Sequence, residues 1–227
     1  MSSGVPFFER GVQPPVRGFI HQPKGDSRAG MVLTHGAGGN CDSKLLLALA
    51  AAFSEAGFVV LRCDLPFRQI RPHGPPSPGS AERDREGLKR AVELLRQKTS
   101  GPVYLGGHSY GGRQASMLAA NEPGIAAGLL LLSYPLHPPR RPEQLRTAHW
   151  SKLSTAMMFV HGSRDPFATL EEMNSAMNLL PARHTLLEID GVGHELLGHK
   201  ANPDLATKIV AAFTDFVALA RTSNGRE

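Results

Sequence analysis

Three side chains in this sequence have the types and the chain order that nucleophilic catalysis needs. Ser109 lies in a Gly-x-Ser-x-Gly motif at residues 107–111, and Asp165 and His194 follow it. A serine hydroxyl is a weak nucleophile near neutral pH, so it needs a base, usually a histidine that a carboxylate orients. We predict that Ser109 attacks an acyl carbon, that His194 carries the proton, and that Asp165 orients His194.

The motif has weight because of where it stands. Gly-x-Ser-x-Gly also arises by chance in glycine-rich chains, and this chain has 24 glycines. Here the motif joins an apolar, strand-like run to a helix-like segment, which is the setting of a nucleophile on a strained turn. In such a turn, Gly107 and Gly111 would avoid clashes that larger residues cause.

Other residues compete for the roles of base and carboxylate. The chain has ten histidines, of which His194 alone combines the expected order, a place one loop beyond a strand, and a neighbouring glycine. His108 and His161 are interpreted as packing or turn residues. Glu188 and Asp190 lie close to His194 in sequence and are alternatives to Asp165.

Attack on an acyl group also requires donors for the developing oxyanion, usually two backbone amides. The amide of Tyr110, directly after Ser109, supplies the first. The glycine-rich residues 34–40 supply the second, with Ala37 the first choice and Gly38 the next. A phosphate-binding loop is the competing interpretation, but the lysine and the serine or threonine that such a loop needs are not in the right positions.

Alternating apolar and helix-period segments must position these groups. Runs rich in Val, Leu and Ile predict buried strands at residues 30–35, 58–64, 102–106, 128–134, 157–162 and 185–189. Helices are predicted at 43–55, 81–97, 110–121, 170–180 and 203–221, the fourth with a capping box at Thr169 and Glu172 and the last with Asn202 as its cap and Pro203 at its first position. The proline-rich residues 68–80 read as a surface loop.

This alternation predicts an α/β fold with a mostly parallel central sheet and helices on both faces. A chain of 227 residues, 41% hydrophobic, suits a single domain over 1–227. Ligands in such sheets bind beyond the carboxyl ends of the strands. Residues 134–156 are too few for a large insertion, so we expect little or no lid domain.

With these motifs in place, the chain resembles the α/β-hydrolase superfamily along nearly its whole length. The resemblance rests on residues 35–39, 107–113, 162–165 and 193–194, in the superfamily's order. Residues 131–139 and 144–146 resemble a small dienelactone-hydrolase-like branch that includes the testis-expressed hydrolase-like protein and NSL-complex subunit 3. The resemblance implies an α/β-hydrolase fold and serine hydrolase activity, although Ser109 stands where dienelactone hydrolases usually carry cysteine.

The loops after the strands suggest a substrate. Without a lid, the site is expected to be open and to take a small-molecule acyl substrate, a carboxylic ester of a small or exposed acyl group. Phe67, Tyr134 and Phe167 are the expected substrate-binding residues. Five arginines in nearby loops either favour esters that carry a carboxylate or phosphate or are ordinary solvated charges: Arg68, Arg71, Arg140, Arg141 and Arg146.

The bulk properties restrict partners and location. The formal charge of +5 comes from scattered Lys and Arg with acidic residues among them, so we expect no nucleic-acid partner. No apolar run approaches the roughly 20 residues that span a bilayer, and we expect no membrane association. Cys41 and Cys63 form neither a metal-ligand pattern nor a disulfide framework. They are interpreted as buried thiols in a cytoplasmic protein without a metal or cofactor.

Two classes of function fit these features. The first is a serine esterase, and thioesterase, amidase and acyltransferase variants would use the same groups. The second is a binding or scaffold module that keeps the fold without catalysis. Scaffold proteins of this kind often lose one of the three catalytic side chains, and here all three candidates are present.

Overall fold

The computed structural model describes residues 4–197 and 204–223. All eight strands in these residues belong to one sheet. The strands are β1 (Val5–Glu9), β2 (Val16–His21), β3 (Ala29–Thr34), β4 (Phe58–Cys63), β5 (Val103–His108), β6 (Leu129–Leu132), β7 (Met157–Gly162) and β8 (His184–Ile189). Their order across the sheet is β1-β2-β4-β3-β5-β6-β7-β8. The pairs from β4 to β8 are parallel, whereas β1–β2 and β2–β4 are antiparallel. The mostly parallel sheet is therefore confirmed.

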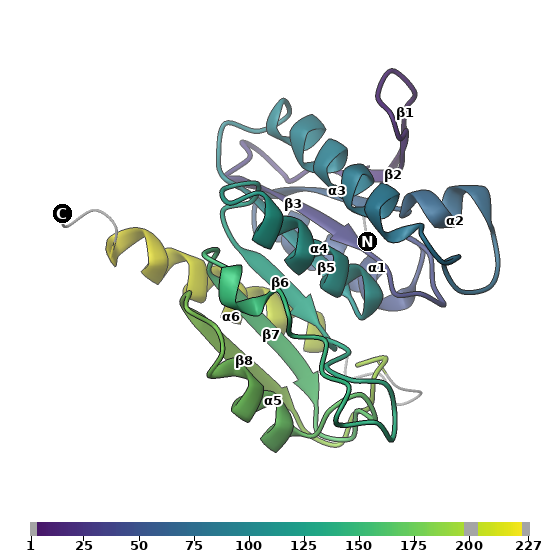
Figure 1. Ribbon diagram of the computed structural model, residues 1–227. Helices are drawn as coiled ribbons and strands as arrows, with labels where there is room; N and C mark the ends of the chain where they lie inside the picture. The colour runs from purple at the N-terminus through teal and green to yellow at the C-terminus, as the bar shows by residue number, and fades with distance from the viewer. Residues whose placement is uncertain (1–3, 198–203, 224–227) are drawn as a thin grey trace.

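Helices cover both faces of this sheet (Figure 1). They are α1 (Lys44–Glu55), α2 (Pro66–Ile70), α3 (Ala81–Arg96), α4 (Tyr110–Asn121), α5 (Leu170–Met177) and α6 (Leu205–Ser223). Buried side chains of α3, α4 and α5 belong to one core cluster and those of α1 and α6 to another, and alternate residues of β3 point into the two. The central strands β3, β4, β5, β6 and β7 are thus buried on both faces, which explains their near-continuous apolar sequences.

Several local predictions differ from the structure. The two antiparallel strands β1 and β2 were not predicted, because β1 is largely exposed and lacks a long apolar run. A short helix, α2, begins with Pro66 and extends into the stretch expected to be loop. The helix α5 ends at Met177 and not at residue 180, although its capping box is present as predicted.

The last helix runs over Leu205–Ser223, close to the predicted range. Its predicted cap Asn202 and first residue Pro203 lie outside the described residues. None of the described helices combines the length and apolar character needed to cross a membrane.

The segment between β6 and β7, residues 133–156, holds a single 3₁₀ helix, η1 (Trp150–Lys152). No lid domain is inserted there, in agreement with the prediction. The carboxyl ends of β3, β5, β7 and β8 therefore open onto one edge of the sheet without a cover from this segment.

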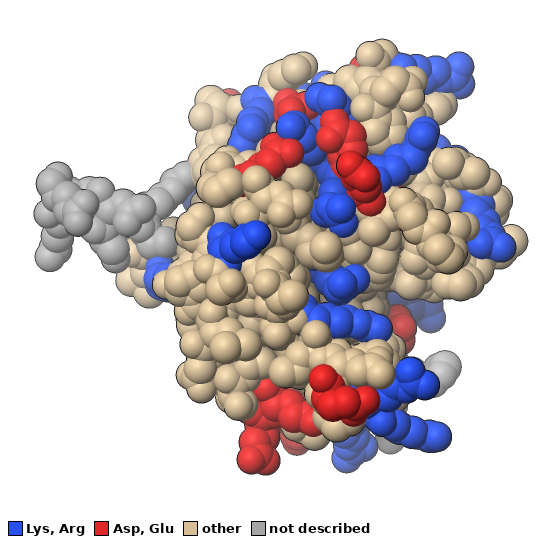
Figure 2. Space-filling view, in the orientation of Figure 1, with Lys and Arg blue, Asp and Glu red and all other residues tan. Residues whose placement is uncertain are grey.

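Charges on the surface are mixed. Figure 2 shows basic and acidic side chains together over α3, where Arg90 pairs with both Glu86 and Glu93. Exposed pairs of this kind add little to stability. They do reduce the local field that a scattered positive charge could otherwise produce.

Candidate active site

Ser109 occupies a strained turn between β5 and α4. Its backbone angles are φ 51° and ψ −115°, in a region that side chains other than glycine rarely adopt. The turn is fixed by hydrogen bonds on both sides: Ser109 N–H donates to the Leu132 carbonyl at 2.8 Å, and its own carbonyl accepts from Arg113 N–H at 3.0 Å. Strain of this kind persists only where the surroundings hold it, and it is typical of functional sites.

The two motif glycines are required by close approach. A Cβ on Gly107 would lie 2.5 Å from backbone atoms of Gly111 and Gly112. A Cβ on Gly111 would lie 2.5 Å from the carbonyl oxygen of His35. The turn is therefore pressed against the loop that follows β3, and no side chain fits between them.

Three strand ends bring Ser109, His194 and Asp165 together. His194 Nε2 lies 2.8 Å from Ser109 Oγ, and His194 Nδ1 lies 2.8 Å from Asp165 Oδ2. The Asp165 side chain has no exposed surface, and its other oxygen accepts the Phe167 N–H at 2.9 Å. Because a buried carboxylate can only accept, the hydrogen-bond network assigns the proton to Nδ1 and leaves Nε2 free to accept from the serine hydroxyl.

The competing carboxylates have other partners. Asp190 Oδ1 accepts a hydrogen bond from Ser163 Oγ at 3.0 Å, and Glu188 Oε1 lies 3.5 Å from Asn174 Nδ2. Among these three acids, Asp165 is the one that hydrogen-bonds to His194 in the described structure.

The His194 ring and backbone have further supports. The Phe167 ring lies 4.2 Å from the His194 ring, centre to centre. His108 Nε2 donates to the His194 carbonyl at 2.8 Å, and burial lowers the pKa of His108 below its ordinary value. His108 had been interpreted only as a packing or turn residue. Its link to a residue 86 positions away has no signal in the sequence.

The loop after β3 lies close to Ser109, and two of its backbone amides have no backbone hydrogen-bond partner among the described residues. Gly39 N–H donates to the Gly36 carbonyl at 3.2 Å and closes a turn, and the amides of Ala37 and Gly38 have no backbone partner within the described chain. A Cβ on Gly36 would lie 3.3 Å from Ser109 Cβ, which shows how near the loop comes. Tyr110 is the first residue of α4, where a backbone N–H has no acceptor inside the helix.

A pocket of about 360 Å³ opens at Ser109. Volumes of this size suit small ligands. It is lined by the loop after β3, the Ser109 turn and the His194 loop, through His35, Gly36, Ala37, Gly38, Gly39, Ser43, His108, Ser109, Phe167, His194 and Glu195.

The structure brings one of the three expected substrate-binding residues to this pocket. Phe167 lines it. Tyr134 is fully buried, packs against Trp150, and donates its hydroxyl to the Arg146 carbonyl at 2.7 Å. Phe67 is 5% exposed and lies beneath the site, with its ring against His35 and Tyr110. Tyr134 and Phe67 therefore belong to the packing around the site and not to the pocket wall.

Arg68 does not fit the role of a rim charge. Its side chain is buried, and its guanidinium donates four hydrogen bonds to backbone carbonyls at 2.7–3.0 Å. Because these hydrogen bonds use most of its N–H donors, the guanidinium has few donors left for an anionic substrate. Arg146 also donates to a carbonyl, that of Pro135, at 3.3 Å.

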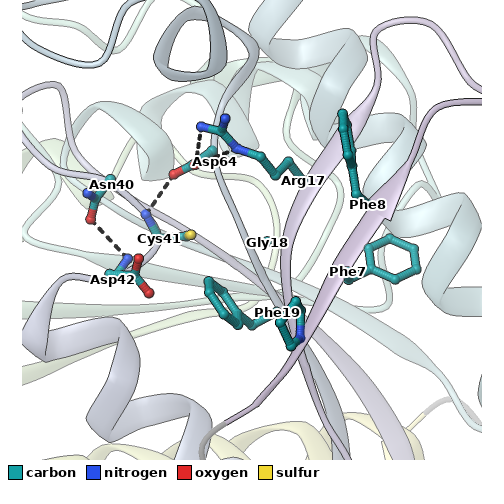
Figure 3. A pocket seen from close by; sticks show the side chains of 10 residues that line it. Phe7, Phe8, Arg17, Gly18, Phe19, Asn40, Cys41, Asp42 and Asp64 are labelled. Carbon is teal, nitrogen blue, oxygen red and sulfur yellow. Dashed lines mark hydrogen bonds and ion pairs between the residues drawn. The ribbon is translucent and has the colours of Figure 1, made fainter.

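A second pocket, of about 470 Å³, is lined by residues 40–42 and by residues of β1 and β2 (Figure 3). Phe7, Phe8 and Phe19 form its apolar side. At its polar end, Asp64 accepts hydrogen bonds from Arg17 and from the Cys41 N–H, as the dashed lines show. This pocket was not anticipated, since it depends on the two antiparallel strands missing from the sequence prediction.

The two cysteines are buried free thiols. Burial raises the pKa of Cys41 to about 12 and raises that of Cys63 as well. Both are therefore protonated and unreactive near neutral pH. Within residues 4–197 and 204–223, no three His, Cys, Asp or Glu side chains gather in a way that could hold a metal ion.

Comparison with known proteins gives a family and a fold. A family model described as an alpha/beta hydrolase domain matches residues 27–220. Among solved structures, the chain is similar to Est1E from Butyrivibrio proteoclasticus, with a TM-score of 0.75 and 18% identity over 95% of this chain and 100% of the other. It is also similar to a dienelactone hydrolase from Anabaena variabilis, with a TM-score of 0.72 and 17% identity over 94% and 96% of the two chains.

A third similar structure is XC6422 from Xanthomonas campestris, described as an α/β serine hydrolase without a lid. Its TM-score is 0.68, at 15% identity over 95% of this chain and 96% of the other. At such low identity these likenesses establish the fold alone, which is the α/β-hydrolase fold without a lid, as predicted.

Proposed function

Since the chain belongs to the alpha/beta hydrolase domain family, we propose that it is a serine hydrolase of carboxylic esters with small or exposed acyl groups. One observation carries the proposal. The Ser109 hydroxyl, the His194 ring and the buried Asp165 carboxylate are joined by two hydrogen bonds of 2.8 Å at the floor of an open pocket.

In the proposed reaction, Ser109 Oγ attacks the ester carbonyl carbon while His194 Nε2 takes the hydroxyl proton. Asp165 keeps the proton on Nδ1 and stabilises the imidazolium that forms. The oxygen of the tetrahedral intermediate becomes negatively charged and is held by the amides of Tyr110 and Ala37, with that of Gly38 beside them.

The intermediate then collapses to an acyl-enzyme. The bond to the alcohol oxygen breaks, and His194 gives its proton to that oxygen. A water molecule next attacks the acyl carbon, again losing a proton to His194 Nε2. Collapse of the second intermediate releases the carboxylic acid and returns the proton to Ser109.

The size and openness of the pocket support short or exposed acyl groups. Its volume of about 360 Å³ is near the lower limit for small-molecule sites, and Phe167 offers one aromatic wall. Ferulic acid has been seen bound to Est1E, a similar structure. Ferulic acid is a carboxylic acid, the kind of product that ester hydrolysis releases. For the present chain we propose carboxylic esters as substrates, and we assign the chain to the small dienelactone-hydrolase-like branch.

The proposal is tested by hydrolysis of p-nitrophenyl acetate, butyrate and decanoate by the wild type, Ser109→Ala and His194→Ala. We expect turnover that falls with acyl length and a loss of about 10⁴-fold or more in both variants. Thioester and anilide analogues of the best acyl group distinguish esterase from thioesterase and amidase activity. A wild-type rate equal to that of Ser109→Ala on every substrate would favour the scaffold alternative.

A further inference from the structure

The guanidinium of Arg68 lies over the Phe67 ring, 4.9 Å from its centre, and its four hydrogen bonds all go to backbone carbonyls. Nε donates to the Gly39 carbonyl at 2.7 Å, and one terminal nitrogen donates to the Ala37 carbonyl at 2.8 Å. Arg71 and Gly74 supply two more carbonyls at 3.0 Å each. Burying an arginine without a carboxylate partner costs free energy unless its N–H donors are hydrogen-bonded. The four carbonyls therefore stabilise the buried Arg68 side chain.

Two of these carbonyls belong to the loop whose amides face the pocket. In a trans peptide, the carbonyl of one residue and the N–H of the next point in opposite directions. Because Arg68 holds the Ala37 carbonyl, the Gly38 N–H must point away from Arg68. Gly38 itself lines the pocket at Ser109, and its amide is unpaired within the described backbone. Arg68 thereby fixes the direction of an amide that can receive the oxyanion.

Residues just before Arg68 form hydrogen bonds with the same loop at two further points. Leu65 N–H donates to His35 Nε2 at 3.1 Å, at the start of the loop. At its far end, Asp64 accepts the Cys41 N–H at 2.8 Å, a contact visible in Figure 3. The segment from residue 64 to residue 68 thus holds the loop at its beginning, middle and end.

The same segment is tied to Tyr110, whose backbone amide is the other proposed oxyanion donor. Phe67 N–H donates to one oxygen of the buried Asp84 at 2.9 Å, and the Tyr110 hydroxyl donates to the other at 2.8 Å. Asp84 therefore connects the helix that carries Arg68 to the residue that follows Ser109. Both sides of the site where an oxyanion would be held are anchored to α2.

We propose that Arg68 is a positioning residue for the oxyanion site, holding the loop after β3 so that its amides face the carbonyl oxygen of the substrate. This rests on the proposed hydrolase function. Arg68 touches neither Ser109 nor the pocket, and it acts through the Ala37 and Gly39 carbonyls. The role is specific to arginine. The planar guanidinium donates hydrogen bonds in several fixed directions at once, whereas a lysine ammonium is a compact group that cannot reach carbonyls on both sides.

The test compares Arg68→Lys and Arg68→Met with the wild type and with Arg83→Met, an exposed arginine on α3 that serves as the matched control. Active sites are first titrated with a fluorophosphonate, so that rates refer to correctly folded protein. We expect kcat on p-nitrophenyl acetate to fall about 10- to 100-fold in both Arg68 variants, since a misplaced oxyanion donor costs up to that much. KM should change less than about threefold, because ground-state binding does not use the oxyanion contacts.

A second readout separates positioning from general stability. A trifluoromethyl ketone forms a tetrahedral adduct with Ser109 and places an oxyanion in the site. Its inhibition constant should rise in the Arg68 variants in proportion to the loss of kcat/KM, while Arg83→Met stays at the wild-type value. A purely structural role would instead lower the titrated fraction and the melting temperature, and leave kcat per active site and the inhibition constant unchanged.

The possible outcomes are distinct. If the wild type turns over and Arg68→Met retains kcat per titrated site within twofold, the positioning role is wrong and the hydrolase proposal stands. If the wild type shows no turnover that depends on Ser109, the proposed function itself is wrong.

Discussion

The segment that carries Ser109 and the loop that carries His194 meet where His194 Nε2 lies 2.8 Å from Ser109 Oγ, but they are built differently. Ser109 follows β5, a fully buried strand in the middle of the sheet, and its position is set by backbone strain and glycine contacts. His194 follows β8, a half-exposed strand at the sheet edge. Its position is set by contacts to the side chains of Asp165, Phe167 and His108.

This difference indicates which contacts hold the Ser109 turn and which hold the His194 loop. The Ser109 backbone is held by the turn itself, through the close contacts at Gly107 and Gly111 and the backbone hydrogen bonds on both sides. The His194 ring, on a loop at the sheet edge, is held by side chains from other segments. Substitutions should therefore act through packing on the serine side and through hydrogen bonding on the histidine side.

The largest effect is expected from a methyl group at the serine turn. Gly111→Ala places a Cβ 2.5 Å from the His35 carbonyl oxygen. We expect activity to be lost and the free energy of unfolding to fall by about 3 kcal/mol, as in other overpacked sites. Urea unfolding and p-nitrophenyl acetate hydrolysis measure both quantities.

Gly193→Ala, beside His194, is the matched control. Among the described residues, its Cβ would meet the Arg164 carbonyl oxygen alone, at an ordinary 3.6 Å, so we expect a change in unfolding free energy within about 0.5 kcal/mol. Equal losses in the two variants would remove the contrast between the loops.

The next effect is on the histidine side. In Asp165→Asn, the side-chain oxygen that accepts the Phe167 N–H is expected to stay in place, which turns the new NH₂ group toward His194 Nδ1. His194 would then carry its proton on Nε2, where it cannot accept the serine proton. We expect kcat to fall about 10³- to 10⁴-fold, with little change in melting temperature.

Asp190→Asn is the control for this change, because Asp190 bonds to Ser163 and not to His194. Its kcat should stay within about twofold of the wild type, which is the size of an ordinary surface substitution. A large loss in Asp190→Asn together with a small one in Asp165→Asn would reverse the assignment of the orienting carboxylate.

Acid is also expected to reduce the stability of the loop over Ser109. Burial lowers the pKa of His35, at the start of the loop over Ser109, to about 4. An unfolded histidine binds a proton near pH 6.5, so the stability from keeping His35 neutral is complete above that pH and is lost as pH falls toward 4. The loss is up to about 3 kcal/mol for a shift of this size.

Urea unfolding at pH 7 and pH 4.5 measures this effect in the wild type and in His35→Gln, whose amide can also donate and accept. The stability lost on acidification should be smaller in the variant. Parallel losses in the two proteins would mean that His35 is not held neutral by its surroundings.

Much of the fold follows from local sequence patterns. The helix at 110–121 has the predicted bounds, because a glycine-rich turn precedes it and its apolar positions recur with helical spacing. The buried parallel strands were predicted within a residue or two at most ends. In contrast, β1 has an exposed edge, and α2 is only five residues long, so neither leaves a pattern that periodicity can detect.

The meeting of Ser109, Asp165 and His194 could be predicted from chain order and strand ends, because all three follow strands of one parallel sheet. The site was not predictable where a side chain's direction decides its role. Tyr134 follows β6 as a pocket residue would, yet its ring turns into the core. Arg68 stands in a proline-rich stretch that suggests a solvated charge, and the carbonyls of Ala37 and Gly39 that bury it lie about thirty residues earlier.

Covalent labelling shows whether Ser109 is a nucleophile that His194 activates. The wild type, Ser109→Ala and His194→Ala are each treated with a fluorophosphonate, and the modified peptide is identified by mass spectrometry. We expect one adduct on Ser109 in the wild type, none in Ser109→Ala, and labelling slowed at least about 10³-fold in His194→Ala. An unlabelled wild type, or an adduct on another residue that persists in Ser109→Ala, would contradict this role of Ser109.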